Sequence, residues 1–80
     1  MNQIVEVIWD DACHHCGDLE RSESFPLSRL KTIGYLVKID KDGNLIVAQE
    51  VDTKNPNSFR YPHIIPKGMI VDWWYLDVTE

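Results

Sequence analysis

The sequence has little of what a disulfide-linked, phosphate-binding or membrane protein relies on. Its cysteines, Cys13 and Cys16, are too few for a disulfide scaffold. The glycines stand apart from one another, so no glycine-rich phosphate loop is present. No apolar run approaches the roughly 20 residues of a membrane-spanning helix, and no signal-peptide pattern opens the chain. These absences predict a cytoplasmic protein without a membrane partner.

Basic residues are also scarce. The chain has 13 acidic and 8 basic residues, a net charge of −5, and its lysines and arginines are spread along the sequence. Binding to duplex nucleic acid is therefore disfavoured. A small pocket with a few local cations can still bind a nucleotide, whatever the total charge. With 80 residues, of which 44% are hydrophobic, residues 1–80 are expected to form a single small domain.

What the sequence does contain is a series of short alternating runs separated by turn residues, which is typical of β-strands. Asp42–Gly43 predicts a tight hairpin turn, because glycine supplies the positive φ that such a turn needs. Pro62 interrupts one run and fits an edge strand or a bulge, and the Pro66–Gly68 segment predicts a second turn. The expected strands span residues 4–9, 30–39, 45–51, 59–65 and 69–78.

Five short strands without a helical period predict a mainly-β fold. We expect a small five-stranded SH3-like antiparallel barrel with one long N-terminal loop over residues 10–28, and an OB-like barrel is the alternative. On the first strand Val5, Val7 and Trp9 share one face. On the second strand the alternation places one set of side chains on a common face: Ile33, Tyr35, Val37 and Ile39.

The last expected strand is apolar on both faces. One face holds Met69, Val71, Trp73 and Tyr75, and the other holds Ile70, Trp74, Leu76 and Val78. A small sheet hides one face in its own core, so the second face predicts packing against another subunit or a ligand. Self-association into a homo-oligomer is the expectation. The alternative is a tightly curled barrel that buries parts of both faces by itself.

The densest cluster of possible metal ligands lies in the long loop. Cys13 and Cys16 have the spacing of a zinc knuckle, but a structural zinc site needs four ligands and there is no second cysteine pair. His63 or a neighbouring chain would have to supply the other donors. A redox or nucleophilic role for either cysteine is disfavoured, because neighbouring carboxylates such as Asp10 and Asp18 raise a thiol pKa. A zinc-binding structural module is therefore one alternative.

Aromatic and basic side chains suggest a second kind of site. Trp73 and Trp74 could stack on a nucleotide base while Arg29 meets a phosphate, as in small barrels that bind single strands. The alternative is that these aromatic residues belong to the core. A metal-dependent enzyme that uses His15 and nearby acids is a further alternative, for which the sequence suggests no substrate.

Several patches resemble short proteins encoded by tailed phages and prophages. They are Trp9-Asp10-Asp11-Ala12, Gly34-Tyr35-Leu36-Val37, Ala48-Gln49 and Ile65-Pro66-Lys67-Gly68-Met69-Ile70. These motifs are strand and turn patterns, and they carry no catalytic signature. The resemblance implies a small β-barrel that acts in a bacterial host, and Cys13 and Cys16 are not part of the shared pattern. By analogy of class, it also implies a protein that blocks or sequesters components of host defence.

The sequence thus predicts a non-enzymatic phage-type binding module that needs no cofactor. As a homo-oligomer it would block a host defence protein or sequester a small nucleotide-like signal. The expected ligand site lies where the long loop meets a neighbouring chain, and its contacts are His14, His15, Arg21, Arg29, Trp73 and Trp74.

Overall fold

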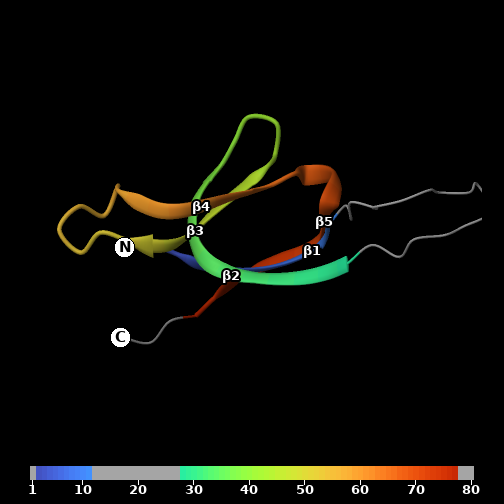
Figure 1. Cartoon of the computed structure of the whole chain (residues 1–80), viewed down its shortest axis with the longest axis horizontal. Helices are drawn as coiled ribbons and strands as arrows, with labels where there is room; N and C mark the ends of the chain where they lie inside the picture. The colour runs from blue at the N-terminus through green and yellow to red at the C-terminus, as the bar shows by residue number, and fades with distance from the viewer. Residues whose placement is uncertain (1, 12–27, 78–80) are drawn as a thin grey trace, which may run out of the picture.

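The computed structural model describes residues 2–11 and 28–77, which form one antiparallel sheet (Figure 1). A 3₁₀ helix, η1 (Lys67–Met69), precedes the last strand. Within these residues no helix is long and apolar enough to cross a membrane. The mainly-β prediction is confirmed, and the strands are β1 (Ile4–Asp11), β2 (Ser28–Ile39), β3 (Leu45–Val51), β4 (Phe59–Ile65) and β5 (Ile70–Leu76).

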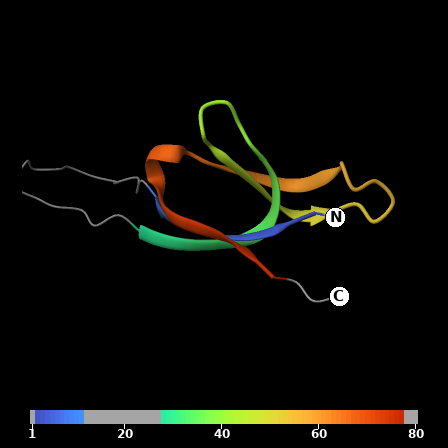
Figure 2. The ribbon, with the colours of Figure 1, turned by 180° about the vertical axis from the view of Figure 1, so that it is seen from behind.

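The strand order of the sheet is β4-β3-β2-β1-β5. The first four strands follow one another as an antiparallel meander, and β5 returns to pair with the other side of β1 (Figure 2). The sheet is not closed, because β4 and β5 lie at its two ends and are not paired with each other in the described part of the chain. Pro62 therefore lies on an edge strand, where a missing backbone N–H is tolerated.

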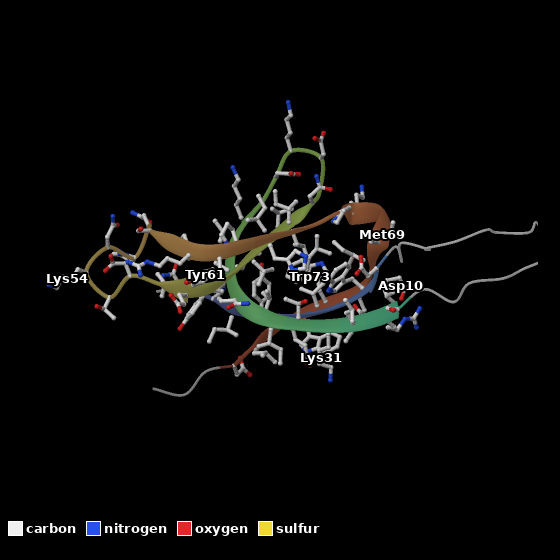
Figure 3. All side chains as sticks on the ribbon, viewed as in Figure 1. Asp10, Lys31, Lys54, Tyr61, Met69 and Trp73 are labelled. Carbon is white, nitrogen blue, oxygen red and sulfur yellow. The ribbon has the colours of Figure 1, made fainter. Side chains whose placement is uncertain are left out.

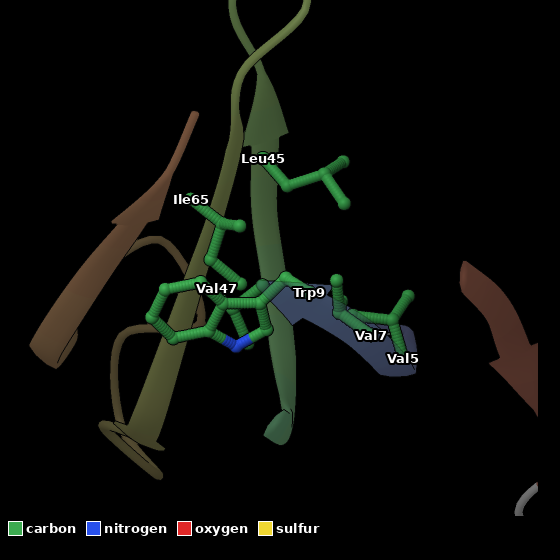
Figure 4. Packing of buried hydrophobic residues seen from close by; sticks show 6 residues of the cluster. All are labelled: Val5, Val7, Trp9, Leu45, Val47 and Ile65. Carbon is green, nitrogen blue, oxygen red and sulfur yellow. The ribbon is translucent and has the colours of Figure 1, made fainter. Parts of the chain in front are cut away.

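The core forms because the sheet bends until its two ends face each other. The side chains of Val5 and Val7 on β1 are fully buried, and they pack with residues of β3 and β4 although β2 lies between these strands in the sheet. Burial of one such aliphatic side chain contributes about 1.5–3 kcal/mol. The predicted core face of β1 is confirmed (Figure 4), and the complete cluster is Val5, Val7, Trp9, Leu45, Val47 and Ile65.

Gly34 lies at a close approach of β2 and β3. A Cβ atom at this position would be 2.6 Å from the carbonyl oxygen of Ala48 and 2.8 Å from Cγ1 of Val47. The β2–β3 ladder begins at the next residue, where Tyr35 pairs with Ala48. The close approach of the two strands therefore requires a residue without a side chain.

A bulge in β2 overturns part of the predicted face. The register between β2 and β3 shifts between Leu36 and Lys38, so that Lys38 pairs with Ile46 and Ile39 pairs with Leu45. An extra residue in one strand reverses the alternation beyond it. Ile39 therefore does not share the face of Ile33 and Tyr35, and that prediction was wrong for the end of the strand.

A second register shift changes the faces of β5. Trp73 and Tyr75 pair with the buried valines of β1 and lie on the core side, whereas Trp74 and Leu76 lie on the opposite side. The register between β1 and β5 shifts between Ile8 and Trp9. As a result Ile70, predicted to accompany Trp74, instead packs against the core.

The turn between β2 and β3 confirms the predicted hairpin. Gly43 has a φ of 87°, and its N–H donates to the carbonyl of Asp40. The Asp40 carboxylate accepts hydrogen bonds from the backbone N–H groups of Asp42 and Asn44, each at 2.9 Å. Asn44 in turn accepts from the N–H of Lys67 at 2.9 Å, which ties this turn to η1. The hydrogen bond from the Asn44 N–H is the main cause of the lowered pKa of the Asp40 carboxyl.

Replacing Gly34 with alanine should destabilise the fold. The new methyl group would meet the Ala48 carbonyl at 2.6 Å, and the backbone must shift to relieve the overlap. We expect a loss of about 1–3 kcal/mol in the free energy of unfolding, measured with urea. Gly68→Ala is the matched control, because a Cβ there meets nothing within 4 Å and should change stability by at most about 0.5 kcal/mol. Equal effects of the two variants would contradict the close approach.

Asp40 should make stability depend on pH in the acid range. Its pKa is lowered in the folded chain, so its contribution is complete above the ordinary aspartate pKa and is lost as the pH falls through the lowered pKa. In Asp40→Asn, urea unfolding between neutral pH and about pH 3 should show a smaller loss of stability than wild type. Asp42→Asn is the control, because Asp42 contributes its backbone N–H to the turn. An unchanged pH dependence in Asp40→Asn would disprove this role.

Candidate functional site

Most of the site residues predicted from the sequence lie outside the described residues. The predicted metal ligands and several predicted contacts belong to this group, so the zinc knuckle and the loop site stay predictions. These residues, together with one residue of the predicted apolar face, are Cys13, His14, His15, Cys16, Arg21 and Val78. Within residues 2–11 and 28–77, no group of three or more His, Cys, Asp or Glu side chains could hold a metal ion.

Arg29, a predicted phosphate contact, is paired with a carboxylate. Its Nε and Nη2 atoms donate to the two carboxylate oxygens of Asp10 at 2.8 and 3.0 Å. The hydrogen bond from Arg29 is the main cause that lowers the pKa of Asp10. The two residues are cross-strand neighbours of β1 and β2. Arg29 therefore joins the ends of two strands, and a phosphate would have to compete with Asp10 for its guanidinium.

Trp73 and Trp74, the predicted apolar contacts, point to opposite sides of the sheet. Trp73 packs on the core and makes an edge-to-face contact with Tyr75, with ring centroids 5.2 Å apart. Trp74 lies on the other side and is 40% exposed. Figure 3 shows Trp73 inside the bend of the sheet, on the side opposite to the Lys31 side chain. A single ligand cannot use both tryptophans of one chain as one wall.

A cleft that was not anticipated from the sequence opens between β2 and β3. It has a volume of about 280 Å³. It lies beyond the Tyr35–Ala48 pair, where the β2–β3 ladder of the described residues ends and the two strands diverge. The residues that line it are Lys31, Thr32, Ile33, Val47, Ala48, Gln49 and His63.

The wall of the cleft on β2 presents backbone hydrogen-bonding groups. The N–H of Leu36 donates to the carbonyl of Gln3, next to β1, at 2.9 Å. Backbone groups in a strand alternate between its two edges, so those of Lys31 and Ile33 face away from β1 and into the cleft. Neither residue has a partner in the described β2–β3 ladder. The cleft therefore offers the donors and acceptors of an unpaired strand edge.

Trp9 connects the cleft to the core. Its indole Nε1–H donates to the hydroxyl of Thr32 at 2.9 Å, and its ring meets the ring of His63 edge to face, with centroids 5.1 Å apart. Thr32 and His63 both line the cleft, whereas Trp9 is buried. The indole thus holds two walls of the cleft in place, one on β2 and one on β4.

The wall of the cleft opposite β2, which β3 and β4 form, is locally distorted. Tyr61 has a φ of 55°, in the left-handed region that a residue with a side chain adopts at a cost. Tyr61 stands opposite Gln49, and these residues form no pair in a β3–β4 ladder that continues on both sides of them. The side chain of Gln49 lines the cleft. The strain and the missing pair therefore lie at its rim.

The positive charge of Lys31, which lines the cleft, is largely compensated by the carboxylate of Glu6. The Nζ atom of Lys31 lies 3.2 Å from Oε1 of Glu6, and this lysine side chain is 59% exposed. The polar lining otherwise consists of the neutral groups of Thr32 and Gln49 and the ring of His63.

Gly34 inside a strand was the one sequence signal near this cleft, because such a glycine marks close backbone approach. The divergence of β2 and β3 could not be recognised from the hydrophobic periodicity of the sequence.

Removing the Thr32 hydroxyl should destabilise the walls of the cleft. In Thr32→Val the Trp9 indole N–H loses its acceptor, which we expect to cost about 1–3 kcal/mol in urea unfolding. Thr32→Ser keeps a hydroxyl and is the control. Valine favours strands more than serine does, so a less stable valine variant would isolate the hydrogen bond. A valine variant as stable as wild type would show that the bond contributes nothing.

Comparison with known proteins does not assign the chain to a family. No family model matches it, and no curated protein or solved structure matches it. What the cleft does is therefore inferred from its geometry and chemistry.

Proposed function

We propose that this chain is a non-enzymatic binding module, and that its cleft takes an extended segment of a partner protein. One observation carries the proposal: the backbone groups of Lys31 and Ile33 face the cleft without a ladder partner in the described residues. An extended peptide adds to such an edge by main-chain hydrogen bonds, and side-chain pockets then provide specificity. The lining side chains of Thr32, Gln49 and His63 are suited to read that segment.

The chemistry of the cleft favours a peptide over a nucleotide-like signal. Binding a phosphate needs local cations, but Lys31 is already paired with Glu6 and Arg29 with Asp10. The volume of about 280 Å³ lies at the small end for ligand sites. It accommodates one or two residues of a strand whose remainder runs along the sheet edge.

The proposed fold family is the SH3-like barrel, with the OB-like barrel as the alternative. The strand order β4-β3-β2-β1-β5 and the 3₁₀ turn before β5 support this assignment. So does the long connection between β1 and β2.

The biological role rests on the phage resemblance and is likewise a proposal. In a bacterial cytoplasm, occupying a segment of a host defence protein would block that protein without catalysis. A zinc-binding module built on Cys13 and Cys16 is the alternative. The absence of zinc from protein purified without chelator, together with an unchanged melting temperature in Cys16→Ser, would remove that alternative.

Peptides selected from a random library displayed on yeast provide the direct test. Strand addition uses the N–H groups of alternate peptide residues. Methylation of the peptide nitrogens at one set of alternate positions should therefore abolish binding in calorimetry, and methylation at the other set should be tolerated. His63→Ala should weaken binding by about tenfold. Ile64→Ala should not, because the neighbouring side chain points to the other side of β4.

Two results would contradict the proposal. Tolerance of methylation at every position would show that no strand pairing occurs. Failure of every peptide, together with mononucleotide binding that shifts the NMR signal of the Trp9 indole N–H, would replace peptide recognition by nucleotide sequestration.

A further inference from the structure

A second apolar surface lies on the side of the sheet opposite to the core. In β1 the residues that alternate with the buried valines point to this side, and their ladder partners on β2 and β5 share it. Ile33 is 55% exposed and Trp74 is 40% exposed. We call this surface the outer face, and its apolar residues are Ile4, Ile8, Ile33, Tyr35, Trp74 and Leu76.

The charges on the outer face compensate each other. Glu6 lies 3.2 Å from Lys31 across β1 and β2, and Arg29 lies 2.8 Å from Asp10. Among the described residues of this face, Asp72 is the charged residue without an ion-pair partner. The whole chain carries a net charge of −5. The outer face is thus close to neutral in an acidic protein, and two copies can approach each other through it with little repulsion.

The edge of β5 beside this face is protected against strand pairing. The N–H of Trp73 is bound by the carboxylate of Asp72 at 2.8 Å. A carboxylate that occupies a backbone donor on an edge strand opposes the addition of a further strand there. Contact between copies is therefore favoured through the outer face and not through this edge.

The register of the sheet makes the outer face complementary to itself. Successive ladder rows read Leu76–Ile4–Tyr35, Trp74–Glu6–Ile33 and Asp72–Ile8–Lys31. A twofold axis along β1 exchanges the ends of each row. Trp74 of one copy then meets Ile33 of the other, and Asp72 meets Lys31. At the ends of the rows, apolar groups face apolar groups and the unpaired carboxylate faces an ammonium group. The β1 residues lie on the axis and meet their own copies. Glu6 therefore meets Glu6, and each of these two carboxylates is paired with Lys31 of its own copy.

We infer that a second copy of this chain covers the outer face in a face-to-face, twofold symmetric dimer. This inference does not depend on the proposed function, which uses the cleft. The outer face is the surface through which the self-association expected from the sequence would take place. An isologous contact of this kind needs one patch that is complementary to itself, and homodimer interfaces are more apolar than ordinary protein surface.

Sedimentation velocity over micromolar to millimolar concentrations tests the dimer. A reductant and a chelator should be present, so that dimers bridged by Cys13 or Cys16 do not count. The wild-type chain should sediment as a dimer. Trp74→Ser should raise the dissociation constant by about tenfold or more, because buried tryptophans dominate such interfaces. Ile33→Ser provides a second variant on the opposite end of the same ladder row.

Ile64→Ser is the matched control, since Ile64 is 59% exposed on β4, at the far end of the strand order from β5. It should leave the dissociation constant unchanged. Circular dichroism identifies any variant that fails to fold. If either Trp74→Ser or Ile33→Ser is unfolded, the sedimentation of the other one tests the dimer. A wild-type monomer throughout the concentration range would overturn the inference. So would a dimer that both Trp74→Ser and Ile33→Ser leave intact, or one that Ile64→Ser weakens equally.

Discussion

The contact between Gly34 and the Ala48 carbonyl is the constraint on which the rest of the structure depends. Next to this point, at Tyr35, the ladder of β2 with β1 ends and its ladder with β3 begins. The absence of a side chain lets the two strands approach, and the sheet can then bend so that β1 packs against β3 and β4. On the other side of the same point β2 and β3 diverge. The core and the cleft are thus consequences of one close approach.

The bend also separates two surfaces with different chemistry. The cleft combines backbone groups that have no ladder partner among the described residues with the polar side chains of Thr32, Gln49 and His63, so it is suited to directional hydrogen bonds with an extended segment. The outer face combines apolar side chains with compensated ion pairs, so it is suited to burial against a similar surface. Ile33 belongs to both, because its backbone faces the cleft while its side chain lies on the outer face. Lys31 does so as well, since it lines the cleft and its side chain ends a ladder row of the outer face. Dimer formation and ligand binding would therefore meet at two residues of β2, Lys31 and Ile33.

Much of the fold could be predicted from local sequence signals. Alternation around Val5 and Val7 identified the core face of β1, and Asp42–Gly43 identified the hairpin, because both signals depend on neighbouring residues. The register shifts at Leu36–Lys38 and Ile8–Trp9 could not be predicted, since a bulge is decided by the partner strand. The cleft could not be predicted either, because it depends on how β2 pairs with its partner strand β3. The predicted loop site stays untested, and the two tryptophans proposed for it point to opposite faces.

Amide hydrogen exchange of the unliganded protein, followed by NMR, tests the central claim most directly. If β2 pairs with β1 alone before Tyr35, the amides of Thr32 and Gly34 point to β1 and should be protected. The amides of Lys31 and Ile33 point into the cleft and should exchange rapidly. Protection of Ile33 equal to that of Gly34 would show that the β2–β3 ladder continues past Gly34. It would contradict both the divergence of the strands and the strand edge, unpaired among the described residues, on which the proposed peptide binding depends.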